Sequence, residues 1–261
     1  MSFQPTLPLT GLAGWSILTK TRANQESVFS ATAAQANLME RFERDFPNIS
    51  SVDELLKNNV ALRVALGAFG LQDDLPNKGF IRRVIMDGTE NPSALANRLT
   101  DKRYFGLAKA LEHLGPSGTG MPSKAMTQDL KKKFLSRSFE IAVGEKNSDY
   151  RLAMAFENEL GSVLNNFTSD RARWFAILGN PPLRKVLQTA LGLPQQIGKI
   201  PLEQQSKVLQ SALKKRFGIS NVGEMDNRKI IEKITNRFIV LSDIQTAKTA
   251  TSPIVELFRR P

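Results

Sequence analysis

Histidine is the side chain most often used for acid–base and metal chemistry near neutral pH, and this chain has one, His113. A histidine-based zinc site needs at least two histidines as a rule, and the chain has no cysteine to complete one. A Ser-His-Asp triad would have to use His113, and no G-x-S-x-G motif supplies its nucleophile. Because His113 stands beside a glycine-rich turn, we interpret it as a helix-end residue. We therefore expect no catalytic residue, no metal and no cofactor.

The segment GPSGTGMPSK, residues 115–124, has the glycines and the lysine that could hold a phosphate. A phosphate-binding loop has the pattern G-x-x-x-x-G-K-[ST] and follows a strand. This segment has no GK pair, its two prolines lack N–H donors, and no strand is expected before it. We interpret it as a linker, although the start of the helix that follows could attract an anion near Lys124.

The densest basic run is Lys131, Lys132 and Lys133, followed by Arg137, on a predicted helix whose other side is apolar. Such a run could bind phosphate or an acidic partner, but a solvated helix face is the more common outcome. Aromatic residues do not alternate with these cations as they do in proteins that bind single-stranded nucleic acid. We keep these four residues, together with Lys124, as candidates for binding a partner or an anion.

Composition sets wider limits on the class of protein. The chain has 261 residues and a net charge of +11, which attracts polyanions such as nucleic acid or an acidic protein face. The sequence contains no run of about 18 apolar residues, the length needed to cross a membrane as a helix. The first residues lack the charged start and apolar core of a secretory signal, so we expect a cytoplasmic protein.

Helical spacing of apolar residues dominates the chain, and strand-like alternation is nearly absent, which predicts an all-α fold. Ser51 and Glu54 form a capping-box pattern at one helix start. Asn91 and Asp101 are expected to cap two others. Beyond two helical segments in 12–45, the expected helices are 60–69, 78–86, 92–100, 102–113, 124–144, 148–166, 182–192, 202–216 and 227–243.

Part of the sequence occurs twice. Residues 52–71 align without a gap on 174–193, a shift of 122 positions, with six identities in twenty. Gly70 and Gly192 both stand where the periodic run ends, so we expect each to be a left-handed C-cap with positive φ. The other identical pairs are Leu56 with Leu178, Asn58 with Asn180, Val64 with Val186, Ala68 with Ala190 and Leu71 with Leu193.

The repeat predicts two related helical subdomains joined by long central helices. The alternative is a chance likeness of two amphipathic helices. We expect Phe134, Phe139, Leu152, Phe156 and Leu160 to form a core shared by the copies. The expected segments are a subdomain at 1–112 with repeat copy 50–112, a connecting loop and helix at 113–150, a subdomain at 151–245 with repeat copy 172–240, and a tail at 246–261 with a flexible start.

Five segments together carry a family resemblance that covers nearly the whole chain. They are GLAGW (11–15), RVALGAFGLQDD (63–74), GFIRRVIMDGTENPSALANRLTDKRY (79–104), FEIAVGEKNSDYRLAM (139–154) and RWFAILGNPPLRKVLQTALGLP (173–194). In this order they resemble the bacterial family catalogued as domain of unknown function 1217. Its members are often encoded among flagellar genes, and the resemblance supplies no catalytic residues.

The leading hypothesis is a non-enzymatic helical interaction protein, whose partner could be a flagellar component. The alternative is a basic nucleic-acid-binding regulator, motivated by the net charge of +11. The third is an enzyme of unrecognised type. Flagellar association would also allow export through the flagellar apparatus, but the chain lacks the long terminal heptad repeats of exported axial components.

Overall fold

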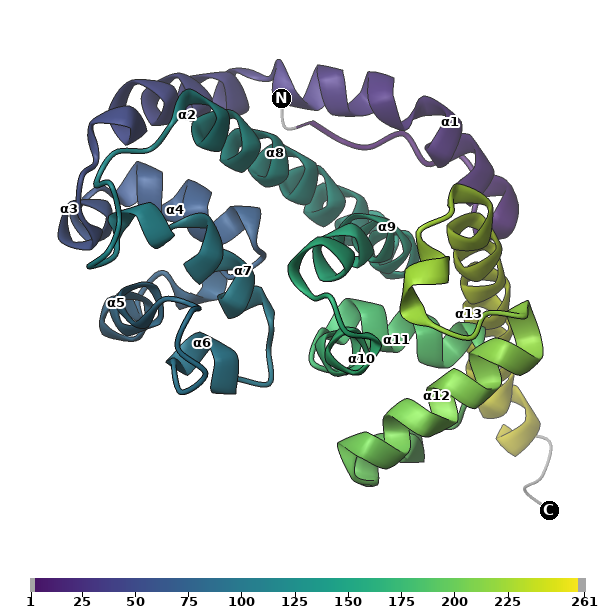
Figure 1. Cartoon of the computed structure of the whole chain (residues 1–261). Helices are drawn as coiled ribbons and strands as arrows, with labels where there is room; N and C mark the ends of the chain where they lie inside the picture. Colours follow the sequence, from purple (N-terminus) through teal and green to yellow (C-terminus); the bar gives the residue numbers. More distant parts are fainter. Residues whose placement is uncertain (1–2, 258–261) are drawn as a thin grey trace. The chain divides into compact units, whose positions relative to one another are not determined.

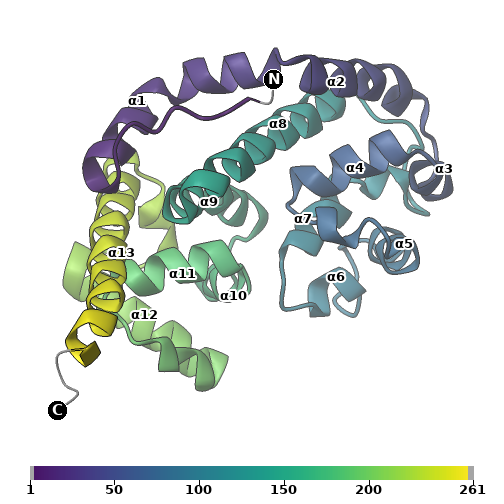
Figure 2. The same cartoon turned by 180° about the vertical axis from the view of Figure 1, so that it is seen from behind.

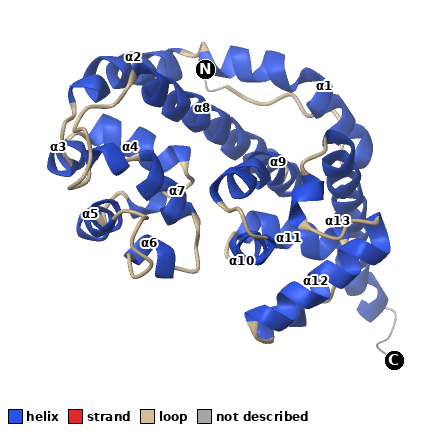
Figure 3. Ribbon diagram, in the orientation of Figure 1, coloured by secondary structure: helices blue, strands red, loops and turns tan. Residues whose placement is uncertain are grey.

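The computed structural model describes residues 3–257, with side chains described as far as residue 247. Thirteen α-helices and five short 3-10 helices follow one another along this stretch, which contains no strand (Figures 1 and 3). The all-α class expected from helical spacing is therefore confirmed. The α-helices are α1 (Gly11–Ser30), α2 (Ala33–Asp45), α3 (Val52–Lys57), α4 (Asn59–Ala68), α5 (Lys78–Asp87), α6 (Leu95–Arg98), α7 (Arg103–Ala110), α8 (Lys124–Lys146), α9 (Ser148–Asn166), α10 (Asp170–Leu178), α11 (Pro181–Ala190), α12 (Leu202–Phe217) and α13 (Arg228–Leu257).

The chain forms two compact units, and the division falls inside α1 and inside α8. Among the described residues, the first unit comprises 3–5 and 22–142, and the second comprises 6–21 and 143–257. These bounds differ from the expected segments, because the start of the chain and the connecting segment 113–150 are each shared between the units. Helical spacing shows where a helix runs but not on which core it packs.

The first unit has its core where α2, α3, α4, α5 and α7 pack against one another. Phe42 stacks on Phe46 with ring centroids 4.9 Å apart, and both side chains are fully buried. Leu62, Leu66 and Ile81 belong to the same cluster and are equally inaccessible to solvent. Burial of such side chains contributes about 1.5–3 kcal/mol each relative to exposure, so this core accounts for the short helices around it.

The start of α3 confirms one half of the predicted capping box. The Ser51 hydroxyl accepts the Glu54 N–H at 3.3 Å. The Glu54 carboxylate turns back one residue further than the pattern implies and accepts the Ser50 N–H at 2.7 Å. Both bonds use N–H groups at the helix start, which have no partner inside the helix.

In the second unit, α11 packs against both α9 and α13 (Figures 1 and 2). Trp174, Phe156 and Phe238 are fully buried in this unit. The Tyr150 hydroxyl donates to the Gly11 carbonyl at 2.7 Å, and the Trp15 ring lies 5.8 Å from the Tyr150 ring. These contacts explain why residues 6–21 belong to the second unit.

The two helices of the repeat match, α4 and α11, begin and end in the same way. Asn58 and Asn180 each accept the backbone N–H three residues later, at 2.9 and 3.1 Å. Gly70 and Gly192 have φ of 69° and 70°, as the sequence predicts. The residue after each glycine donates back to the carbonyl five residues earlier, at 2.9 Å in both helices, which is the Schellman ending.

Several expectations need correction. The helix expected at 92–100 is only α6, because the Asn91 side chain accepts the Ser93 N–H in a turn and starts no helix there. The helix expected to end at 243 continues past Pro253 to Leu257. Residues 244–252 contain neither glycine nor proline, so no helix-ending residue stands at the expected end. The start of the expected flexible tail is therefore helical, whereas the side chains from 248 onward and residues 258–261 lie outside the described part.

The prediction that five residues of the two central helices form one shared core is also wrong. Phe134 and Phe139 are buried and lie in the first unit, whereas Phe156 and Leu160 are buried and lie in the second. Leu152 is only half-buried. Periodicity places these residues on one stripe of each helix but does not show that the helices belong to different packing units.

Candidate interaction surfaces

Three of the five basic residues singled out on α8 are occupied by ion pairs within the first unit. Lys131 Nζ lies 2.9 Å from Glu43, and Lys133 Nζ lies 2.6 Å from Asp129. Arg137 lies 3.0 Å from Glu140. The remaining two, Lys124 and Lys132, are exposed and make no ion pair with a described residue.

These ion pairs have different environments. The Lys131 hydrogen bond is the largest influence on Glu43, and it lowers the pKa of that carboxyl below its ordinary value. Lys133 also lies over the Phe69 ring, 5.4 Å from its centroid. Phe69 is only half-buried, although the apolar face of its helix is expected to be buried. Glu140 is 1% exposed, so its pair with Arg137 belongs to the interior. The α8 set stays a prediction for partner binding, with much of its charge already compensated.

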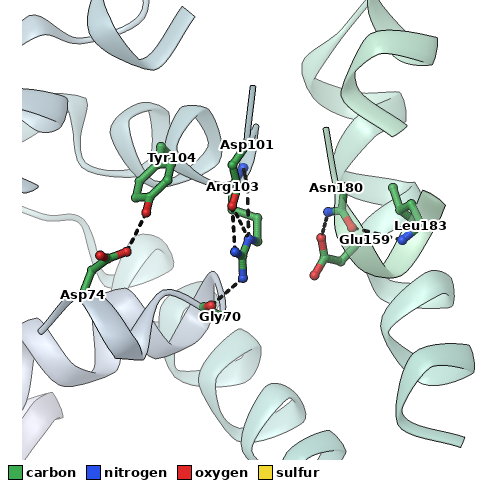
Figure 4. Close-up of polar contacts among 8 residues, drawn as sticks. All are labelled: Gly70, Asp74, Asp101, Arg103, Tyr104, Glu159, Asn180 and Leu183. Carbon is green, nitrogen blue, oxygen red and sulfur yellow. Dashed lines mark hydrogen bonds and ion pairs between the residues drawn. The ribbon is translucent and has the colours of Figure 1, made fainter. Parts of the chain in front are cut away.

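A polar cluster surrounds the end of α4 (Figure 4). Arg103 donates to the Gly70 carbonyl at 2.6 Å and pairs with Asp101 at 2.7 Å. A positive charge at a helix C-terminus satisfies free carbonyls and interacts favourably with the helix dipole. The Tyr104 hydroxyl donates to Asp74 at 2.6 Å, and burial followed by this contact raises the pKa of Tyr104 above its ordinary value.

Polar side chains form hydrogen bonds at both ends of α11. Asn180 caps the helix start and also donates to the carboxylate of Glu159 on α9, which is 9% exposed (Figure 4). At the other end, Arg237 on α13 donates to the Ala190 carbonyl at 2.7 Å. An arginine from a later helix thus binds a carbonyl at the end of both α4 and α11. Sequence reasoning missed both arginines, because no local pattern connects them to those helix ends.

His113 is the middle residue of a short 3-10 helix (Glu112–Leu114) that follows the end of α7, and it is 7% exposed. Its ring packs edge-on against Phe46, with centroids 6.4 Å apart, and neither ring nitrogen has a hydrogen-bond partner of good geometry among the described residues. Burial lowers the pKa of His113 and outweighs the opposing effect of the nearby Ala110 carbonyl. The glycine-rich turn folds back so that the Gly120 N–H reaches the His113 carbonyl at 2.8 Å.

The second unit has a basic helix that sequence reasoning did not single out. An open depression on α12 is lined by Lys207, Val208, Ser211, Ala212 and Lys215, which we call the α12 surface. Val208 is 38% exposed, although it is apolar. The two lysines make no ion pair with any described residue. The sequence shows valine and alanine among lysines here, but helical spacing assigns these residues only to a predicted helix.

Comparison with known proteins places this fold in a family. A model described as "Protein of unknown function (DUF1217)" matches residues 68–237. The chain belongs to this family. The resemblance carried by the sequence motifs is therefore confirmed, and the match spans the ends of α4 and α11 as well as the α12 surface.

The fold is also similar to the crystal structure of protein AGR_C_984 from Agrobacterium tumefaciens. The TM-score is 0.76 at 21% sequence identity, and the alignment covers 93% of this chain and 99% of that chain. At this identity the likeness shows the fold alone. A search of curated proteins finds no match.

No group of three or more His, Asp or Glu side chains within the described residues could hold a metal ion. No helix in the same part of the chain has the length and apolar character needed to cross a bilayer.

Proposed function

We propose that this protein is a non-enzymatic helical interaction protein that binds another protein through its second unit. The observation that carries the proposal is the α12 surface, where exposed Val208 and half-buried Ala212 lie beside lysines without ion pairs. A partner that covers this surface would remove apolar atoms from water and pair with two cations. Arg103, Asn180 and Arg237 support the non-enzymatic part of the proposal, because each of them forms hydrogen bonds at a helix end.

We further propose a cytoplasmic role in flagellar assembly or its regulation, with a flagellar component as the partner. The support is the gene neighbourhood that the family resemblance implies. Deletion of the gene, followed by scoring of swimming motility and filament number, tests this role. We expect reduced motility that a wild-type copy restores. Normal motility and normal filaments would contradict it, and finding the protein in sheared filaments would favour export instead.

The alternative proposal is a nucleic-acid-binding regulator, favoured by the net charge of +11. Contacts between lysines or arginines and phosphates release counterions, so affinity would fall steeply with salt. Titration of duplex DNA and of RNA at low and at physiological salt tests this alternative. Absence of binding at low salt would eliminate it.

We also propose that α4 and α11 are equivalent helices of a duplicated module. The support is their matching asparagine caps and glycine endings, which coincide at the same shift of 122 residues. Superposition of residues 50–112 on 172–240 tests the duplication. Unrelated helix directions would leave only a likeness of two amphipathic helices.

A further inference from the structure

The α12 helix is amphipathic, and its packed face is fully occupied. Leu209 and Leu213 are buried at 1% and 0% exposure, and α12 packs against α10. On the same side, Gln205 donates to the Ile200 carbonyl at 2.7 Å. In Figures 1 and 2 the helix lies at the margin of the second unit. The opposite face of α12 therefore has no partner among the described residues, apart from an Arg171–Glu203 contact of 4.0 Å at its first turn.

The charge of that free face is uncompensated. α12 carries four cations and one carboxylate, and none of the four makes an ion pair with a described residue: Lys207, Lys214, Lys215 and Arg216. The contrast with α8 is direct, since three of its five basic candidates are already ion-paired. A carboxylate approaching α12 would therefore meet cations that need not first leave another partner.

The shape of the surface limits what can bind there. Ser211 and Ala212, both small, lie between Lys207 and Lys215, which are two helical turns apart, or about 12 Å along the axis. Small residues at the centre let another helix approach to about 8–10 Å between axes. Val208 and Ala212 then offer apolar contact to one side chain of the incoming helix.

We infer that the α12 surface docks an acidic amphipathic helix of a partner protein, an inference that rests on the interaction function proposed above. The partner presents carboxylates two turns apart, which pair with Lys207 and Lys215, and an apolar side chain midway that covers Val208. A nucleic-acid backbone would use the lysines but would gain nothing from the exposed valine. The apolar floor is the feature that favours a protein helix.

The probe for the test is a fluorescently labelled, alanine-based helical peptide with two glutamates two turns apart and a leucine midway. Binding to the full chain is measured by fluorescence polarisation at low and physiological salt. The test variants are Lys207→Gln/Lys215→Gln and Val208→Asp. The matched control is Lys124→Gln/Lys132→Gln, which removes the same charge from two exposed α8 lysines at the same spacing. Circular dichroism checks that every variant is folded.

We expect the peptide to bind wild type with a dissociation constant below about 1 mM. The α12 double variant should bind about tenfold more weakly, because two exposed ion pairs are lost, and Val208→Asp should weaken binding by a similar factor. The control variant should stay within about twofold of wild type. Equal losses in both double variants would overturn the inference, as would unchanged binding of a glutamine-for-glutamate peptide.

Two comparisons separate this inference from the wider function. An oligonucleotide that binds through Lys207 and Lys215 more tightly than the peptide would overturn the inference in favour of nucleic acid. A chromosomal Lys207→Gln/Lys215→Gln variant with normal motility, in a species where deletion abolishes motility, would overturn the α12 surface and leave the flagellar role standing. Peptide binding at α12 together with normal motility after deletion would support the surface and contradict the flagellar role.

Discussion

Gly70 and Gly192 provide a matched pair of substitutions, because their backbones are alike and their surroundings differ. Both have positive φ, 69° and 70°. Apart from its chain neighbours, a Cβ on Gly192 would meet no atom of a described residue within 4 Å, whereas a Cβ on Gly70 would lie 3.2 Å from the Arg137 guanidinium. Replacement by alanine should therefore cost backbone strain alone at Gly192, and strain plus displacement of Arg137 at Gly70.

The magnitudes follow from these two effects. Left-handed backbone costs a residue with a Cβ about 1–2 kcal/mol, offset by about 0.4–1 kcal/mol from the lower entropy of the unfolded chain. Gly192→Ala should thus destabilise by about 1 kcal/mol. Arg137 pairs with Glu140, which is 1% exposed, at 3.0 Å. Weakening that bond adds about 1–2 kcal/mol, so Gly70→Ala should cost about 2–3 kcal/mol.

Urea denaturation followed by circular dichroism measures both free energies of unfolding. The extra cost at Gly70 should disappear in an Arg137→Ala background, since a double-mutant cycle isolates the interaction between the two positions. Equal costs for the two glycines would refute the reasoning, and so would an extra cost that persists without Arg137.

Three further predictions concern single side chains. As the pH is lowered through about 6.5, the free energy of unfolding should decrease, and it should decrease less in His113→Leu. The reason is that burial lowers the pKa of His113, so the unfolded chain binds the proton more tightly than the folded chain. Equal acid sensitivity of the two proteins in urea denaturation would contradict this. Asn180→Ala should cost about 2–3 kcal/mol and Asn58→Ala about 1 kcal/mol, because Asn180 donates to the buried Glu159, whereas the Asp45 carboxylate that Asn58 contacts is only half-buried. Equal shifts in the urea midpoint would oppose that explanation. Tyr104→Phe should cost about 1–2 kcal/mol through the lost bond to Asp74, and a thermal midpoint at the wild-type value would show that bond to be unimportant.

The features that the sequence alone determined are local ones. Asn58 and Asn180 cap their helices through bonds to an N–H three residues away, and Gly70 and Gly192 end them through their own backbone freedom. Such interactions join atoms that are close in any helix of that sequence, so spacing and residue type suffice to predict them. The all-α class and the family follow from patterns of the same kind.

Tertiary structure alone decided which charges are available to a partner. Lys131 was a sequence candidate, but it pairs with Glu43, which is 88 positions away along the chain. Lys207 was not a candidate, yet it lies on a face that no described carboxylate reaches. The same holds for Arg103 at the end of α4 and for Trp15 in the second unit. Coulomb attraction and packing depend on distance through space, whereas helical periodicity assigns a residue to a face and leaves open what that face meets.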